Sequence, residues 1–326
     1  MRRRDFLGLA AVPLAGRPSA SWAQQRAPQI VGFLHSGTLN SYRNLLISFR
    51  KGLAEGGFVE GQNLVIEYGF AEGQFERLPQ LANDLIKRGA SVMVTGGIGS
   101  ALGARKANAT IPLVFLAGDD PVKFGLVASL NRPGGAATGI AWLTSQIFTK
   151  RLAIIRDLMP AVAVIGFLFN PKSPEAEPQL REIEAAAKSI GQPLALVQAS
   201  GEPDFDKAFA LLDQRRAGAL IVSNDAFFNS KRERLAALAG QRRLPTIYDR
   251  REYVLAGGLI SYGTSYAAAY RELGLYAAKV LKGTPPADIP IEQATKFEMV
   301  INLKTAAALQ LEIPARVLAL ADEVIE

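Results

Sequence analysis

Apolar runs and stretches of helical periodicity alternate along most of the chain. Ile30–Leu34 is a short apolar run, and the stretch after it has one apolar face, formed by Leu45, Leu46, Phe49 and Leu53. The predicted strands are continuous apolar runs rather than alternating ones, which is typical of parallel sheets covered on both faces. Strands that alternate with helices at this spacing predict βαβ units.

The alternating pattern occurs twice. One series ends with the run "PLVFLAG", and a second begins after "ATGIAWLT" and continues to the end of the chain. A length of 326 residues also suggests two domains. We therefore predict an α/β protein with two Rossmann-like lobes, parallel sheets and three crossovers in the hinge. The predicted N-terminal lobe is 28–141 plus 263–290, and the predicted C-terminal lobe is 142–262 plus 291–326.

The N-terminal segment has the order of a secretory signal. Three arginines precede the apolar stretch of "MRRRDFLGLAAVPLAG", and small residues follow at Ser21 and Ala23. The arginines before "DFLGL" resemble a twin-arginine export signal. We expect residues 1–23 to be a cleaved signal peptide and the mature protein to be periplasmic. The apolar stretch is far shorter than the ~20 residues that span a bilayer, which argues against an anchor.

Composition and charge narrow the function classes. Removal of residues 1–23 takes four arginines and one aspartate from the net charge, which changes from +7 to +7 − 4 + 1 = +4. The remaining Lys and Arg are scattered among acids, so we expect no nucleic-acid partner. With no cysteine and His35 as the only histidine, thiol nucleophiles, Cys-ligated zinc and a Ser-His-Asp triad have no support. We expect no metal, no cofactor and no enzyme activity.

Polar residues gather where the predicted strands end. The loops are "HSGTLNS", "TGGIGSA", "AGDDPVKFG", "NPKSPEAE", "SNDAFFNS" and "YDRREYV". In open α/β sheets these loops surround the ligand, and their Gly, Ser, Thr, Asn and Asp residues cap helices or offer N–H groups to an anion. The glycines of "TGGIGSALG" fit neither a P-loop nor a G-x-G-x-x-G motif, so a ligand carboxylate near Ser100 is favoured over a cofactor phosphate.

Several stretches resemble the ABC-transporter substrate-binding proteins, in the branch associated with tryptophan or tyrosine. They include "GFLHSG", "DPVKFGLVASLNRPGG", "FFNSKRERLAALA", "VLAGGLISYGTS" and "KFEMVINLKTAAALQLEIP". The resemblance covers the chain from Pro28 to Glu326. It implies the type I periplasmic binding protein fold, closure of two lobes on a small molecule, and delivery to ABC permease subunits in the inner membrane. We expect the protein to be a monomer.

The predicted ligand contacts are strand-end and hinge residues. They are Ser36, Gly37, Gly97, Ser100, Asp119, Asn170, Ser173, Asp225, Phe227, Tyr248, Glu252 and Tyr262. Asp119 either accepts a ligand ammonium or caps the following turn, whereas Asp120 and Pro121 are expected to start a helix. Either Phe227 or Phe228 faces the cleft. Trp142 is read as hinge packing, and His35 as a residue with a local hydrogen bond.

Together these features predict a solute-binding protein for an aromatic or other hydrophobic amino acid. Two alternatives remain open from the sequence. One is a periplasmic sensor with the same pocket, and the other is an enzyme on the same scaffold that uses Asp119, Asp225 and Glu252.

Overall fold

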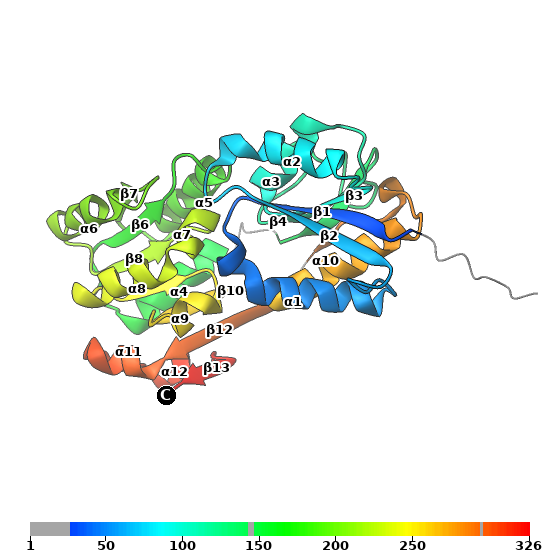
Figure 1. Cartoon of the computed structure of the whole chain (residues 1–326). Coiled ribbons are helices and arrows are strands. Elements are labelled where there is room, and N and C mark those ends of the chain that lie inside the picture. Colours follow the sequence, from blue (N-terminus) through cyan, green and yellow to red (C-terminus); the bar gives the residue numbers. More distant parts are fainter. Residues whose placement is uncertain (1–26, 143–146, 294–295) are drawn as a thin grey trace, which may run out of the picture.

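The computed structural model describes residues 27–142, 147–293 and 296–326, which form two α/β lobes (Figure 1). The predicted signal peptide, residues 1–23, lies outside the described residues. Within the described ranges, no helix combines the length and the apolar character needed to cross a membrane.

The first lobe is built on a six-stranded parallel sheet with the order β11-β5-β4-β3-β1-β2. Its strands are β1 (Gln29–His35), β2 (Leu64–Phe70), β3 (Val92–Gly96), β4 (Leu113–Ala117), β5 (Ala137–Ala141) and β11 (Glu292–Gln293). Helices cover both faces of this sheet (Figure 1). One face carries α1 (Leu39–Glu55) and α10 (Tyr266–Leu281), and the other carries α2 (Leu78–Lys87) and α3 (Ile98–Ala107). The short helix η1 (Phe75–Arg77) leads into α2, and η3 (Pro286–Asp288) precedes β11.

The second lobe is built on a seven-stranded sheet with the order β13-β12-β10-β9-β8-β6-β7. All neighbours are parallel except β10 and β12. Its strands are β6 (Ile165–Phe169), β7 (Leu194–Gln198), β8 (Ala219–Val222), β9 (Thr246–Tyr248), β10 (Ile260–Thr264), β12 (Phe297–Asn302) and β13 (Glu323–Ile325). Its helices are α4 (Ile147–Leu158), α5 (Ala176–Ser189), α6 (Asp204–Gln214), α7 (Ala226–Ser230), α8 (Arg232–Gln241), α9 (Arg251–Leu255), α11 (Leu303–Ala308) and α12 (Ala315–Leu318).

Both sheets place the first strand of the lobe between its second and third strands. In each lobe the helices on either side of the first strand therefore diverge, which leaves a crevice at the carboxyl ends of the strands. The continuous apolar strands have the burial that their sequences predict, since β3, β4, β5 and β8 are buried at every position. The predicted fold class, with two Rossmann-like lobes and parallel sheets, is confirmed.

The chain passes between the two sheets three times. It leaves the first sheet after β5, returns after β10 to form α10, and leaves again after β11. Because β11 pairs with Ile140 and Ala141 of β5, the last crossing follows Gln293, whereas the predicted boundary was at 290. β10 ends at Thr264, so the middle crossing follows that residue rather than 262.

The α1 and α10 helices pack with unusually close backbones. Thr38 caps α1 by accepting a hydrogen bond from the Ser41 N–H at 3.3 Å. A Cβ added to Gly52 would lie 1.8 Å from the carbonyl oxygen of Arg271, and one added to Gly274 would lie 2.2 Å from that of Phe49. Only glycine at both positions allows this contact. The pair fixes α10, whose first residue reaches the interface between the lobes.

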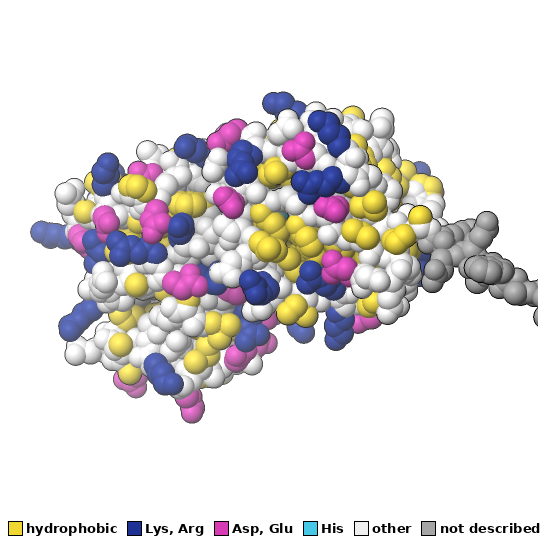
Figure 2. Space-filling view, viewed as in Figure 1, with side chains coloured by type: hydrophobic (Ala, Val, Ile, Leu, Met, Phe, Trp, Pro, Cys, Tyr) yellow, Lys and Arg dark blue, Asp and Glu magenta, His cyan; other side chains and the backbone are white. Residues whose placement is uncertain are grey.

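Charged side chains are interspersed over the face shown in Figure 2, where Lys and Arg alternate with Asp and Glu. Several of them form surface ion pairs, such as Arg50 with Glu60 at 2.6 Å and Arg88 with Glu67 at 3.1 Å. Exposed pairs of this kind contribute at most about 1 kcal/mol each to stability. The fold is therefore held mainly by the four buried apolar clusters that flank the two sheets.

Candidate functional site

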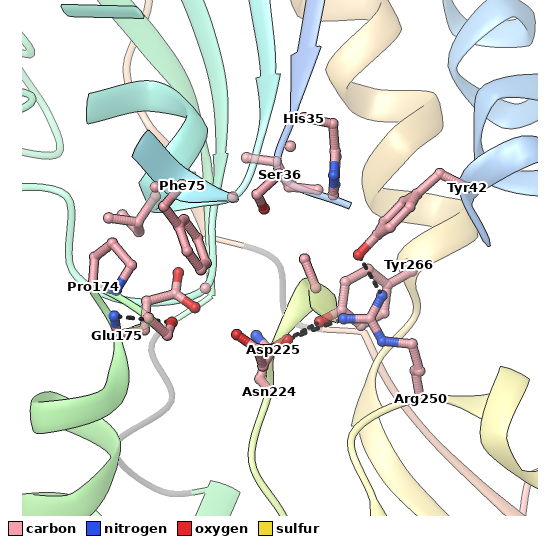
Figure 3. A pocket seen from close by; sticks show the side chains of 18 of the residues that line it. His35, Ser36, Tyr42, Phe75, Pro174, Glu175, Asn224, Asp225, Arg250 and Tyr266 are labelled. Carbon is pink, nitrogen blue, oxygen red and sulfur yellow. Dashed lines mark hydrogen bonds between the residues drawn. The ribbon is translucent and has the colours of Figure 1, made fainter. Parts of the chain in front are cut away.

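A pocket lies between the two lobes (Figure 3). Its walls are segments that follow β1, β3 and β4 in the first lobe and β6, β8 and β9 in the second. This is the edge of the sheets at which open α/β proteins bind ligands.

Aromatic side chains form much of the wall. Tyr42 comes from α1, Phe75 from η1, Trp142 follows β5, and Tyr266 and Tyr270 come from α10. Trp142 and Tyr266 meet edge to face, with ring centroids 5.1 Å apart and planes at 73°. Aromatic rings pack favourably against other rings in offset or edge-on geometry. The pocket therefore suits a ligand with a flat hydrophobic group.

Arg250, two residues after β9, is the one cation among the described residues that line the pocket, and each of its three nitrogens has a hydrogen-bond partner. Its Nε donates to Asp249 Oδ2 at 2.9 Å, its Nη2 to Asn224 Oδ1 at 3.0 Å, and its Nη1 to the Tyr42 hydroxyl at 3.4 Å. Its guanidinium carbon lies 3.8 Å from the centre of the Tyr266 ring. Burial disfavours the charge, but Asp249 and the tyrosines outweigh burial and raise the pKa of Arg250 well above its usual value.

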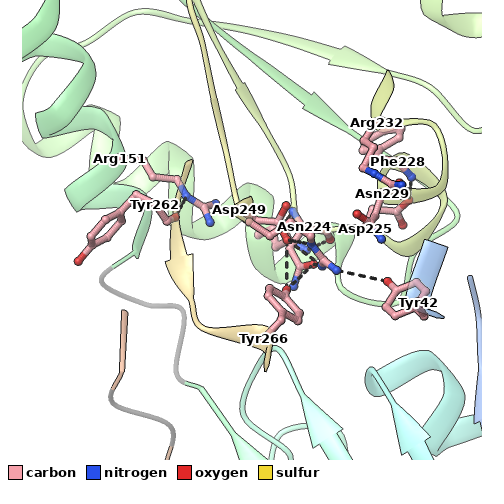
Figure 4. A network of polar contacts seen from close by, with 12 residues as sticks. Tyr42, Arg151, Asn224, Asp225, Phe228, Asn229, Arg232, Asp249, Tyr262 and Tyr266 are labelled. Carbon is pink, nitrogen blue, oxygen red and sulfur yellow. Dashed lines mark hydrogen bonds and ion pairs between the residues drawn. The ribbon is translucent and has the colours of Figure 1, made fainter. Parts of the chain in front are cut away.

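The arginine network joins the two lobes (Figure 4). Tyr42 belongs to α1 of the first lobe, whereas Asn224 and Asp249 follow β8 and β9 of the second. The Tyr266 hydroxyl, at the start of α10, lies 3.1 Å from Asp249 Oδ2 and 3.2 Å from Asn224 Oδ1. A charged group with partners in both lobes ties their relative position to the shape of the pocket.

His35 is a neutral side chain at the end of β1. Its Nδ1 accepts a hydrogen bond from the Gly37 N–H at 2.8 Å, which places the single ring proton on Nε2. Burial, together with the charge of Arg250, lowers the pKa of His35 to about 3. The pocket wall therefore carries an uncharged N–H donor at this point.

Glu175 and Asp225 supply carboxyl groups to the pocket. Asp225 caps α7, since its Oδ1 accepts from the Phe228 N–H at 3.0 Å, and its Oδ2 accepts from Asn170 Nδ2 at 3.2 Å. Burial raises the pKa of Asp225 to about 6. Burial, with repulsion from Asp119 and Asp225, raises the pKa of Glu175 to about 8. A cation placed between these groups would lower both pKa values, so the pair suits a ligand ammonium.

The two lobes touch beside the pocket. Gly97, with a φ of 102° that glycine adopts without strain, leads into α3. Glu175 belongs to the opposite lobe from α3. The Ile98 N–H at the start of α3 donates a hydrogen bond to Glu175 and so partly offsets the rise in its pKa. A Cβ added to Gly118 would lie 2.9 Å from Asn224 Nδ2 and 3.4 Å from Glu175 Oε1. The helix end at which a ligand carboxylate was expected therefore faces a carboxyl group of the protein.

Four of the predicted contacts line the pocket, namely Ser36, Gly97, Ser173 and Asp225. Three others lie directly behind the wall. The Gly37 N–H donates a hydrogen bond to His35, and the Asn170 amide donates one to Asp225. The charge of Asp119 raises the pKa of Glu175.

The other predicted contacts lie away from the pocket wall. Ser100 is fully buried within α3, and Tyr248 stacks on Tyr253 in the second-lobe core with centroids 4.4 Å apart. Tyr262 stacks on Phe297. The remaining two are Phe227, which stacks on Phe205, and Glu252, which lies in the first turn of α9.

The segment after β4 differs from the prediction. Asp120 and Pro121 do not start a helix, because residues 121–125 form turns that end at Gly125 with a φ of 67°. Asp120 Oδ1 accepts from the Val122 N–H at 3.0 Å, and Asp119 Oδ1 accepts from the Asp120 N–H at 2.6 Å. Asp119 is buried, and its other oxygen has no hydrogen-bond partner among the described residues.

Sequence reasoning missed several residues of the pocket. Glu175 and Arg250 lie in strand-end loops that the sequence singled out, but nothing in those loops marks them above their neighbours. Tyr42, Tyr266 and Tyr270 lie on helices and resemble ordinary core positions. Trp142, which the sequence assigned to hinge packing, packs on Tyr266 after β5 and also lines the pocket.

Comparisons with known proteins agree with this geometry. The family described as "ABC transporter substrate binding protein" matches residues 38–325. A tyrosine-binding protein of Clostridioides difficile strain R20291 is 26% identical over 264 residues, which cover 81% of this chain and 76% of that protein.

Two solved structures are similar over most of the chain. A conserved domain protein of Vibrio cholerae has a TM-score of 0.85 at 26% identity and covers 91% of this chain and 99% of its own. An ABC domain from Streptococcus pneumonia, solved in complex with L-Trp, has a TM-score of 0.83 at 25% identity and covers 92% of this chain and 100% of its own.

Proposed function

The chain belongs to the ABC transporter substrate binding protein family, and we propose that it binds an aromatic L-amino acid in the pocket between its lobes. The observation that carries the proposal is a wall of five aromatic side chains beside two carboxyl groups, those of the half-buried Glu175 and the buried Asp225. The rings suit an aromatic side chain and the carboxyl groups suit its ammonium. Ligands named for similar proteins, tyrosine and L-Trp, support this choice.

Proteins of this family are solute-binding proteins and not enzymes, and they act outside the cytoplasm. We propose further that residues 1–23 direct export to the periplasm, and that the bound amino acid is delivered to ABC permease subunits. Of the predicted contacts, the proposal keeps Ser36, Gly97, Ser173 and Asp225 at the ligand, with Asp119 acting through Glu175.

Binding is proposed to be coupled to closure of the lobes. A ligand that touches both lobes gains contacts that the open state lacks, and this difference selects the closed state. Gly118 supports this view. Because it has no side chain, Asn224 of the second lobe can come close to it and the lobes can meet beside the pocket.

Calorimetric titration of the full chain with L-tyrosine, L-tryptophan, L-leucine and L-aspartate tests the proposal. We expect saturable binding of the aromatic amino acids, weaker binding of L-leucine and none of L-aspartate.

Replacement Gly118→Val should weaken binding at least about tenfold, because the added side chain collides with Asn224 when the lobes close. Gly240→Ala, on an exposed part of α8, serves as the control and should leave affinity unchanged. Tight binding of another class of solute, with no binding of aromatic amino acids, would overturn the proposal.

A further inference from the structure

The charges around the pocket are unbalanced in favour of anions. Glu175 and Asp225 line it, and Asp119 lies close enough to raise the pKa of Glu175. Among the described lining residues the one opposing cation is Arg250, and its charge is already opposed by Asp249 at 2.9 Å. A ligand ammonium therefore meets carboxyl groups, whereas a ligand carboxylate meets, among the described lining residues, only Arg250, whose charge Asp249 already opposes.

Arg250 is also poorly placed to turn toward a ligand carboxylate. Its Nε, Nη2 and Nη1 donate to Asp249, Asn224 and Tyr42, and the Tyr266 ring covers one face of the guanidinium, so a reorientation of the side chain would break these contacts. Breaking a buried, hydrogen-bonded ion pair is strongly unfavourable, because it leaves the Asp249 carboxylate buried without its partner. Arg250 thus has a structural role in joining the lobes.

The remaining groups that face a ligand carboxylate are neutral. His35 carries its proton on Nε2 and has a pKa of about 3, so it donates without a charge. The Ser36 hydroxyl is a second donor on the wall. The Ile98 N–H, which begins α3, is directed in part to Glu175. Hydrogen bonds between neutral donors and a carboxylate are weaker than those in which both partners carry a charge.

We propose that the pocket recognises its ligand mainly by the ammonium group and the aromatic ring, so that aromatic amines without a carboxylate bind as well. This proposal rests on the function proposed above and extends its ligand class from aromatic amino acids to aromatic amines such as tyramine and tryptamine. Aromatic acids without an amine are excluded, because their carboxylate would lie beside Asp225, which is ionised at neutral pH, with no ammonium to compensate the two charges.

Matched ligands test this inference. Calorimetric titration at constant pH compares L-tyrosine with tyramine, which lacks the carboxylate, and with 4-hydroxyphenylpropionate, which lacks the amine. We expect tyramine to bind within about tenfold of L-tyrosine, and the acid to bind at least about 100-fold more weakly.

Charge-removing variants show whether the carboxyl groups are responsible. Glu175→Gln and Asp225→Asn keep the shape of the side chains, and Asn at position 225 retains the cap of α7. Each should weaken L-tyrosine and tyramine by about tenfold or more while improving or leaving unchanged the binding of the acid. Glu177→Gln is the control, since Glu177 lies two positions further along the chain and its side chain is 80% exposed.

The outcomes separate the two proposals. If L-tyrosine binds but tyramine binds more than 100-fold more weakly, the carboxylate is required and the inference about amines fails while the proposed function stands. If the acid binds as well as L-tyrosine, the inference fails as well. If none of the three compounds and no L-tryptophan binds, the proposed function itself fails.

Discussion

Glu175 has a position and a pKa that its place in the sequence does not predict. It precedes α5 in a loop with the composition of an ordinary helix start, yet the fold turns its carboxyl group into the interlobe pocket beside Asp119 and Asp225. Burial and these two charges hold its pKa near 8, against an ordinary value of 4.5. Without a cation beside it this group is protonated near neutral pH, and a ligand ammonium would favour its ionised form.

A pH dependence of stability follows from this raised pKa. The folded state holds the Glu175 proton more tightly than the unfolded chain does, so the contribution of this group is full below about pH 4.5 and is lost as the pH rises through about 8. We expect the free energy of unfolding of the ligand-free protein to fall by about 1–2 kcal/mol more than that of Glu175→Gln between pH 5 and pH 9, because water in the pocket reduces the full effect. Urea denaturation at several pH values measures both. Parallel pH profiles for the two proteins would contradict the assignment.

At the scale of elements, the contact between α1 and α10 determines where the pocket tyrosines lie. Tyr42 projects from the first turn of α1 and Tyr266 begins α10, so the spacing of the two helices fixes the distance between these rings. That spacing depends on Gly52 and Gly274, at which the two backbones meet.

Replacement Gly52→Ala tests the helix contact. The added methyl group would lie 1.8 Å from the Arg271 carbonyl oxygen, so the helices must separate. We expect a loss of at least about 2 kcal/mol in the free energy of unfolding, measured by urea denaturation. Gly240→Ala, in the exposed part of α8 with no atom within 4 Å of the added group, should instead raise stability by about 0.5–1 kcal/mol. Equal effects of the two substitutions would show that the α1–α10 contact is loose.

The elements themselves follow largely from the sequence, because their determinants are local. Continuous apolar runs predict the buried strands, and the cap of α1 by Thr38 and that of α7 by Asp225 lie where strand-end loops supply the right side chains. The turns after Asp120 could not be distinguished from a helix start, because both begin with an acid and a proline. The left-handed Gly125 decides the outcome, and a glycine is compatible with either structure.

The pocket follows from the sequence only in part, because its membership depends on how the lobes meet. Ser36, Gly97, Ser173 and Asp225 lie at strand ends, and the rule for open sheets places such residues at the ligand edge. Tyr42 has the helical spacing of a core residue and becomes a pocket residue only because the second lobe faces it. Local patterns carry no information about that juxtaposition.

At the scale of the whole molecule, the two lobes repeat one topology and bring the carboxyl ends of both sheets to a shared pocket. Direct contacts between the lobes at Gly118 and through Arg250 mean that the pocket is complete only when the lobes are together. A ligand that bridges them stabilises this arrangement by its differential affinity for the closed state. The central claim is that an aromatic amino acid is this ligand.

Trp142 offers a direct test of that claim, since it lines the pocket and the chain has only one other tryptophan, Trp22, within the predicted signal segment. In the full chain with Trp22→Phe, tryptophan emission reports Trp142 alone, and L-tyrosine can be titrated without a second indole in solution. We expect a saturable change in emission with L-tyrosine and none with L-aspartate, because the ligand ring contacts or displaces water from Trp142. Emission that remains unchanged as L-tyrosine rises to its solubility limit would contradict the account.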